Sequence, residues 1–172
     1  MKAGPTLLSS CAKAATSEEA AFRVQTPNSL TRASRIVALD PQAEAIMHRV
    51  EEQPWAGAHF LTFVRKEAAP KLESLPWDAV MRGSDGAETR LSAELAGADV
   101  MVMIATETAD AVAASVIGNA CFVRGIMGAG LVVSPSGGPA GAAVQALRPS
   151  CSVLVIASGE EYVPEMLTAL RA

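Results

Sequence analysis

Aromatic residues and cysteines are scarce in this chain of 172 residues, in which 4% of the residues are Phe, Trp or Tyr and three are Cys. An aromatic-filled core and a base-stacking surface for nucleic acids both require more rings than this. The cysteines are odd in number and none are spaced as C-x-x-C. This pattern is typical of a reducing compartment, so we expect a cytoplasmic protein with buried thiols.

Excess positive charge and long apolar runs are also lacking. The 14 Lys and Arg residues stand against 18 Asp and Glu residues, for a net charge of -4, which opposes binding to nucleic acids and anionic membranes. The most apolar stretch, residues 111–123, is bounded by Asp110 and Arg124 and is shorter than the roughly 20 residues that span a bilayer. We expect neither a nucleic-acid nor a membrane partner.

Recognisable catalytic and metal motifs are missing as well. His48 and His59 stand in no Cys-His or Ser-His-Asp arrangement, and both fit structural roles better than catalytic ones. Cys121 and Cys151 fit small core residues better than nucleophiles. The sequence therefore identifies no metal ligand, and it leaves the catalytic residues, the cofactor and the question of enzyme activity open.

What the chain does contain is alternating strand and helix patterns. Residues 99–105 and 126–133 are apolar runs separated by a polar elbow and an Ala-rich helix, and Asp40 followed by Pro41 begins another helix. Further strands are expected at residues 36–39, 59–64, 77–81 and 152–157, and further helices at 88–96, 140–147 and 160–170. The alternation predicts a three-layer α/β/α sandwich on a mostly parallel, doubly wound, Rossmann-like sheet of about five to six strands.

We predict a single Rossmann-like domain at residues 34–172. Residues 1–33 carry no sustained apolar period, so they are predicted to form a mobile or peripheral N-terminal extension.

The expected ligand site is the carboxyl edge of the sheet, where doubly wound folds bind small molecules. The loop at residues 134–141, SPSGGPAG, offers two glycines and a helix start, which suit an anion such as a nucleotide or sugar phosphate. Polar or small residues also follow the other predicted strands. The predicted ligand-binding residues are Ser84, Asp85, Thr106, Thr108, Asp110, Ser134, Ser136, Gly137 and Gly138.

Other interpretations of the same residues stay open. Glu107 and Asp110, with Asp40 and Asp85, could gather around Mg²⁺ in a hydrolase or transferase. The Ala-rich and Met-rich helix faces could instead pack against a second copy, as in a structural or regulatory homo-oligomer without catalysis. Each polar loop could also be an ordinary turn or helix cap.

Residues 96–135 distantly resemble the tubulin-like cell-division GTPases in their strand, helix and strand pattern, and residues 36–46, IVALDPQAEAI, are similar to another strand and acidic turn of that family. The resemblance implies a parallel sheet. The family's glycine-threonine-glycine phosphate loop is replaced here by TETADA at residues 106–111. Because Glu107 and Asp110 would repel a phosphate, no GTPase residue is assigned from the resemblance.

Overall fold

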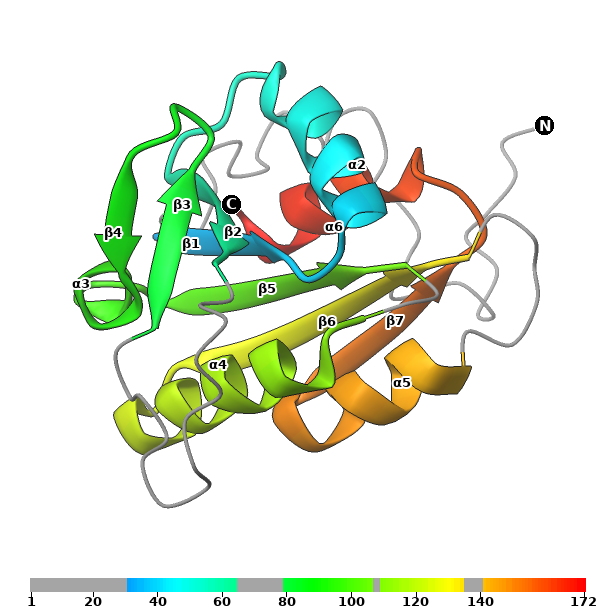
Figure 1. Cartoon of the computed structure of the whole chain (residues 1–172). Helices are drawn as coiled ribbons and strands as arrows, with labels where there is room; N and C mark the ends of the chain where they lie inside the picture. The colour runs from blue at the N-terminus through cyan, green and yellow to red at the C-terminus, as the bar shows by residue number, and fades with distance from the viewer. Residues whose placement is uncertain (1–30, 65–78, 107–108, 135–140) are drawn as a thin grey trace, which may run out of the picture. The chain divides into compact units, whose positions relative to one another are not determined.

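The computed structural model describes residues 31–64, 79–106, 109–134 and 141–172 (Figure 1). These residues form a seven-stranded sheet in the order β4-β3-β2-β1-β5-β6-β7. The strands are β1 (Ser34–Ala38), β2 (Ala58–Phe63), β3 (Val80–Gly83), β4 (Glu88–Arg90), β5 (Val100–Ala105), β6 (Met127–Val133) and β7 (Val153–Ala157). The helices are α2 (Pro41–Glu51), α3 (Leu91–Leu95), α4 (Ala111–Arg124), α5 (Gly141–Leu147), η2 (Arg148–Ser150) and α6 (Tyr162–Leu170).

The sheet separates two helical layers, so the predicted three-layer α/β/α sandwich is confirmed. Helices α2 and α6 cover one face, whereas α4 and α5 cover the other (Figure 1). Strand β5 lies between the two layers, and all six of its residues are fully buried. Val102 and Ile104 of β5 and Val132 of β6 are each 0% exposed, as expected for apolar strands covered on both faces.

Five strands are parallel, and the remaining two form an antiparallel edge. Strand β1 pairs in parallel with β2 and β5, and β5, β6 and β7 continue the parallel sheet. The arrowheads of β5, β6 and β7 point the same way in Figure 1. Strand β3 is antiparallel to β2, and β4 is antiparallel to β3. The sheet is therefore mixed, and it has more strands than the sequence predicted.

The hairpin of β3 and β4 corrects the sequence-based prediction of a helix over residues 88–96. The helix begins only at Leu91, because Glu88–Arg90 pairs as β4 with β3, Arg82 opposite Glu88 and Val80 opposite Arg90. The apolar spacing that predicted the helix came from Leu91 and Leu95, which are both buried. That spacing carried no information about the three residues before them.

Helix α2 begins where its sequence predicts. The Asp40 side chain accepts a hydrogen bond from the Ala43 N–H at 2.8 Å, and Pro41 occupies the first turn, where no intrahelical N–H bond is lost. The buried residues of the helix are Ala43, Ile46, Met47 and Val50. These four residues recur at i, i+3, i+4 and i+7 spacing, so they form one apolar face that packs on the sheet.

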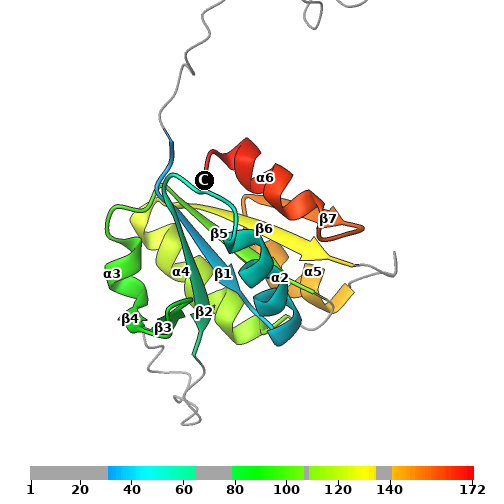
Figure 2. The same ribbon diagram turned by 90° about the horizontal axis from the view of Figure 1, so that it is seen from above.

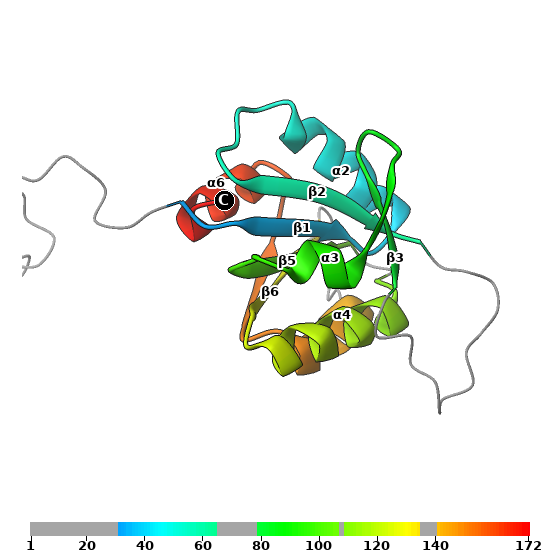
Figure 3. The same cartoon turned by 90° about the vertical axis from the view of Figure 1, so that its left-hand side faces the viewer.

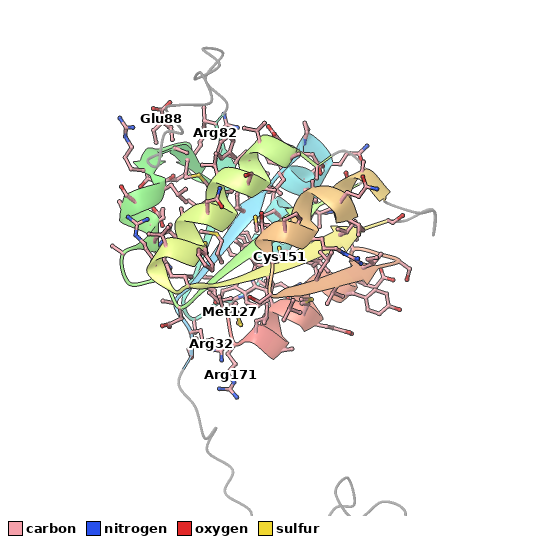
Figure 4. All side chains as sticks on the ribbon, turned by 90° about the horizontal axis from the view of Figure 1, so that it is seen from below. Arg32, Arg82, Glu88, Met127, Cys151 and Arg171 are labelled. Atoms are coloured by element: carbon pink, nitrogen blue, oxygen red, sulfur yellow. The ribbon has the colours of Figure 1, made fainter. Side chains whose placement is uncertain are left out.

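The two ends of the described fold are joined by hydrogen bonds. The Arg32 N–H donates to the Arg171 carbonyl at 2.9 Å, and these two residues lie close together in Figure 4. The Ala33 N–H donates to Asp99 Oδ2 at 2.9 Å. Residues 32 and 33 thus belong to the hydrogen-bonded structure, whereas residues 1–30 of the predicted extension lie outside the described residues.

Among the described residues, no helix has both the length and the apolar character needed to cross a membrane.

Candidate functional site

The order of the parallel strands reverses at β1. The chain moves from β1 outward to β2 on one side and later returns to β5 on the other side. Helix α2, which follows β1, and helix α4, which follows β5, lie on opposite faces of the sheet (Figure 3). The two strand-to-helix connections therefore diverge above the carboxyl ends of β1 and β5, which is where open α/β sheets bind ligands.

Asp40 and Thr106 connect the two loops at this point. Asp40 follows β1 and Thr106 follows β5, and their side chains are 8% and 3% exposed. The Thr106 N–H donates to Asp40 Oδ2 at 2.7 Å, and the Thr106 hydroxyl donates to Asp40 Oδ1 at 2.9 Å. The same hydroxyl lies 3.1 Å from Gln42 Oε1. The carboxylate of Asp40 therefore both caps α2 and holds the end of β5.

Ser134 adds a third buried polar side chain at the same edge. It follows β6, it is 2% exposed, and its N–H donates to the Ala157 carbonyl of β7 at 2.9 Å. Within the described ranges, the buried polar or charged residues are Ser34, Arg35, Asp40, Thr106 and Ser134. Three of the five thus stand at the carboxyl ends of the neighbouring strands β1, β5 and β6. Burial of a polar group is unfavourable unless the group is hydrogen-bonded.

The charge at this edge is negative where the two helices start. Asp40 caps α2, and Asp110 accepts hydrogen bonds from the Val112 and Ala113 N–H groups of α4 at 2.9 and 3.1 Å. The N–H groups that would otherwise attract an anion at these helix starts therefore already face a carboxylate.

The predicted site residues fall into three groups. Thr106, Asp110 and Ser134 follow or lie near the carboxyl ends of β5 and β6, as predicted. Thr108, Ser136, Gly137 and Gly138 lie outside the described residues, as does Glu107 of the acidic elbow.

Ser84 and Asp85 are placed differently from the prediction. Strand β3 is antiparallel to β2, with Gly83 opposite Leu61, so the turn that follows β3 lies toward the amino end of β2. The expectation that these two residues share an edge with Thr106 and Ser134 was therefore wrong. A parallel β3 would have brought them to the carboxyl edge.

A groove of about 320 Å³ lies beside Ser84 and Asp85. It is bordered by the last turn of α2, the first half of β2, the β3–β4 turn and α3. Strand β3 pairs with β2 only from Leu61 onward, so the start of β2 is paired with β1 on one side, and the described residues place no strand on its other side. The polar residues that line the groove are Glu51, His59, Ser84, Asp85, Thr89 and Glu94.

Ion pairs and hydrogen bonds organise one wall of this groove. Arg35 Nε lies 3.0 Å from Glu94 Oε2 and donates to the Glu94 carbonyl at 2.9 Å. His59 Nδ1 lies 3.2 Å from the same Oε2 atom. Across the groove, the Ser84 hydroxyl donates to Glu51. Arg35 therefore neutralises Glu94, while Glu51 and Asp85 keep the groove acidic.

Sequence reasoning missed both this groove and the part played by Gln42. Glu51, His59 and Glu94 come from α2, β2 and α3, and the reversal of β3 along β2 brings the Ser84 turn to the same place. The Ser84-Asp85-Gly86 turn was the available signal, because such a turn between two short strands marks a hairpin. Recognising Glu88–Arg90 as a strand would have indicated the reversal.

The described side chains form no evident metal site, and the thiols are not activated. Within the described ranges, no three His, Cys, Asp or Glu side chains gather as metal ligands. Burial raises the pKa of Cys121 to about 12, with a smaller contribution from the nearby Cys151, and burial raises the pKa of Cys151 to about 11. Both thiols stay protonated near neutral pH. Cys121 is buried in the core, as predicted, whereas Cys151 is only partly buried.

The fold defines a class, the α/β/α sandwiches with a Rossmann-like, doubly wound sheet. No known protein family and no curated protein matches the chain.

Proposed function

We propose that this chain is a small-ligand-binding domain whose ligand sits over the carboxyl ends of β1, β5 and β6. The observation that supports the proposal is the row of buried polar side chains Asp40, Thr106 and Ser134, one after each of three neighbouring strands. The row spans the point where the strand order reverses, and the core strands between these residues and the amino edge are apolar.

The ligand class follows from the acceptors at this edge. Asp110, a partly exposed carboxylate at this edge, suits the hydroxyl groups of a ribose or another sugar, because carboxylates accept hydrogen bonds. Both carboxylate oxygens of Asp40 already accept hydrogen bonds from its own chain. The anionic group of a nucleotide or sugar phosphate is assigned by sequence alone to the loop that holds Ser136, Gly137 and Gly138. We place the protein in the cytoplasm as part of this proposal, since Cys121 and Cys151 are free thiols.

The first experiment is a thermal-shift screen followed by calorimetry. The panel contains nucleoside monophosphates, sugar phosphates and their unphosphorylated parents, each with and without Mg²⁺. A ligand at 100 times its Kd stabilises the folded state by about 2.7 kcal/mol, so binding raises the melting temperature. A response that requires Mg²⁺ would favour the hydrolase or transferase hypothesis built on the acidic elbow.

Two serines then locate the site. Ser134→Ala removes a hydroxyl at the carboxyl edge, and Ser84→Ala removes one at the groove. Loss of a single hydrogen bond weakens binding by roughly 2- to 10-fold, so Ser134→Ala should raise the Kd while Ser84→Ala leaves it unchanged. The reverse pattern would contradict the proposed site. So would a screen in which neither the phosphates nor their unphosphorylated parents stabilise the protein.

The groove at the amino end of β2 is the second candidate. Its volume of about 320 Å³ falls at the lower end of the roughly 300 to 1,000 Å³ typical of ligand pockets. Glu51 and Asp85 would select a small ligand that carries an amine or guanidinium group. Arginine and a short diamine therefore join the screening panel, and stabilisation by either that is lost in Ser84→Ala would favour the groove.

A further inference from the structure

The two edges of the sheet differ in how they are protected. Strand β4, at one end, has three residues, and two of them, Glu88 and Arg90, are charged. Strand β7, at the other end, has five residues with the sequence VLVIA, without a charge or a proline. Natural sheets shield their edges with short strands, charges and prolines, so β4 is protected in the usual way and β7 is not.

Strand β7 also exposes apolar side chains on both of its faces. In the part of the chain that the structure describes, β7 pairs only with β6. Val153 and Ile156 are 43% and 59% exposed, Val155 is 36% exposed, and Tyr162 at the start of α6 is 45% exposed. By contrast, Ala129, Leu131 and Val132 of the neighbouring strand β6 are fully buried. This contrast is what a strand with a missing neighbour produces.

The charges around β7 are arranged so that the strand complements a copy of itself. Exposed Arg148 precedes the strand, and exposed Glu160 and Glu161 follow it. If two copies of β7 lie antiparallel, the basic end of each strand meets the acidic end of the other. Glu160 also pairs with Arg49 of its own chain, which leaves Glu161 as the main partner for Arg148. No charge lies within the strand to oppose its copy.

We propose that β7 pairs with β7 of a second copy, antiparallel about a two-fold axis at Val155, so that the sheet continues across a homodimer. In this register Val153 stands opposite the partner's Ala157, and Leu154 opposite the partner's Ile156. Members of each pair lie on the same face of the sheet, because residues directly opposite in neighbouring strands do so. The contact is a single short strand with flanking side chains, so the dimer forms reversibly and its population depends on concentration.

The test is sedimentation velocity on the full chain from about 1 to 200 µM. Wild-type protein should shift from monomer to dimer over this range. Val155→Lys should stay monomeric at all concentrations, because two lysines would meet at the axis. Phe122→Lys is the matched control, since Phe122 on α4 is 85% exposed and receives the same charge away from β7; this variant should still dimerise.

A charge exchange tests the antiparallel arrangement. Arg148→Glu should weaken the dimer by about 3- to 30-fold, because two ion pairs are replaced by repulsions. Arg148→Glu combined with Glu161→Arg should restore the wild-type Kd. Circular dichroism and thermal unfolding check that each variant is folded.

Several outcomes would overturn the proposal. A wild-type protein that is monomeric at the highest concentration would overturn it. If hydrogen exchange of that monomer then shows protected β7 amides, residues of the same chain cover the edge of β7. A dimer that persists in Val155→Lys or is lost in Phe122→Lys would place the interface elsewhere. A failure of the double charge variant to recover would exclude the antiparallel register.

Discussion

Single residues fix how closely the elements of this fold approach each other, and Gly118 is the sharpest case. It lies in the middle of α4, where glycine is unfavourable for a helix by about 1 kcal/mol relative to alanine. A Cβ atom at this position would lie 2.3 Å from Ser150 Cβ and 2.9 Å from Ser150 Cα. The absence of a side chain at Gly118 therefore lets η2 pack closely against α4. Strand β7 follows directly after η2 and forms the edge of the described sheet.

Gly118→Ala is expected to lower the free energy of unfolding by about 1 to 3 kcal/mol, because the added methyl group overpacks a contact that no side-chain rotation can relieve. Asn119→Ala is the control, since Asn119 is exposed on the same helix and should gain up to about 0.7 kcal/mol from helix propensity. Urea unfolding followed by circular dichroism measures both. A Gly118→Ala variant as stable as the wild type would mean that η2 shifts freely.

At the scale of elements, the two helices beside the reversal of strand order start in the same way, but the aspartates that cap them have different hydrogen-bond partners. Both α2 and α4 are capped by an aspartate. Asp110 bonds the first turn of its own helix, whereas Asp40 also bonds the backbone and hydroxyl of Thr106, 66 residues away. Asp40 therefore joins β1, α2 and β5 and shapes the floor of the proposed ligand site.

Asp40→Ala should consequently destabilise the fold more than Asp110→Ala does. Loss of a helix cap costs about 1 kcal/mol, which is the expected effect at Asp110. At Asp40 the substitution also leaves the buried Thr106 N–H without its acceptor, which costs about 1 to 3 kcal/mol more. The Thr106 hydroxyl keeps Gln42 Oε1 as an acceptor. Denaturant unfolding with unchanged m-values measures the difference. Equal losses for the two variants would show that the Asp40–Thr106 bonds contribute nothing to stability.

At the scale of the molecule, the described residues form two cores, one on each face of the sheet, and hydrogen bonds at the ends of the described fold. One core packs α2 and α6 on the sheet, and the other packs α3, α4 and α5 on its opposite face. The packing of these helices over the strands is seen from above in Figure 2. The bonds of Arg32 to Arg171 and of Ala33 to Asp99 are among the hydrogen bonds at these ends.

Removal of residues 1–30 is therefore expected to leave a cooperative unfolding transition and most of the stability, because that segment lacks a sustained apolar period. The midpoint and slope of urea unfolding for residues 31–172 are compared with those of the full chain. A broad transition, or a large fall in the slope, would show that the first 30 residues contribute to the core.

The sequence by itself determined the layered α/β class, the start of α2 and the buried strands β5 and β6. These features depend on local signals: an Asp-Pro helix start, apolar runs of strand length and alternation of strand with helix. Thr106, Asp110 and Ser134 could be assigned to one edge for the same reason, since each follows a strand that is parallel to its neighbours.

Only the tertiary structure decided the direction of β3, the existence of β4 and, with them, the position of Ser84 and Asp85. A short strand carries no local mark of whether its neighbour runs parallel or antiparallel, because the direction depends on pairing with residues distant in the sequence. The bond between Asp40 and Thr106 arises in the same way, as does the position of β7 at the edge of the sheet that the described residues form. Strand order, which no local pattern encodes, decided which polar groups meet at the proposed site and which apolar strand is left at the edge.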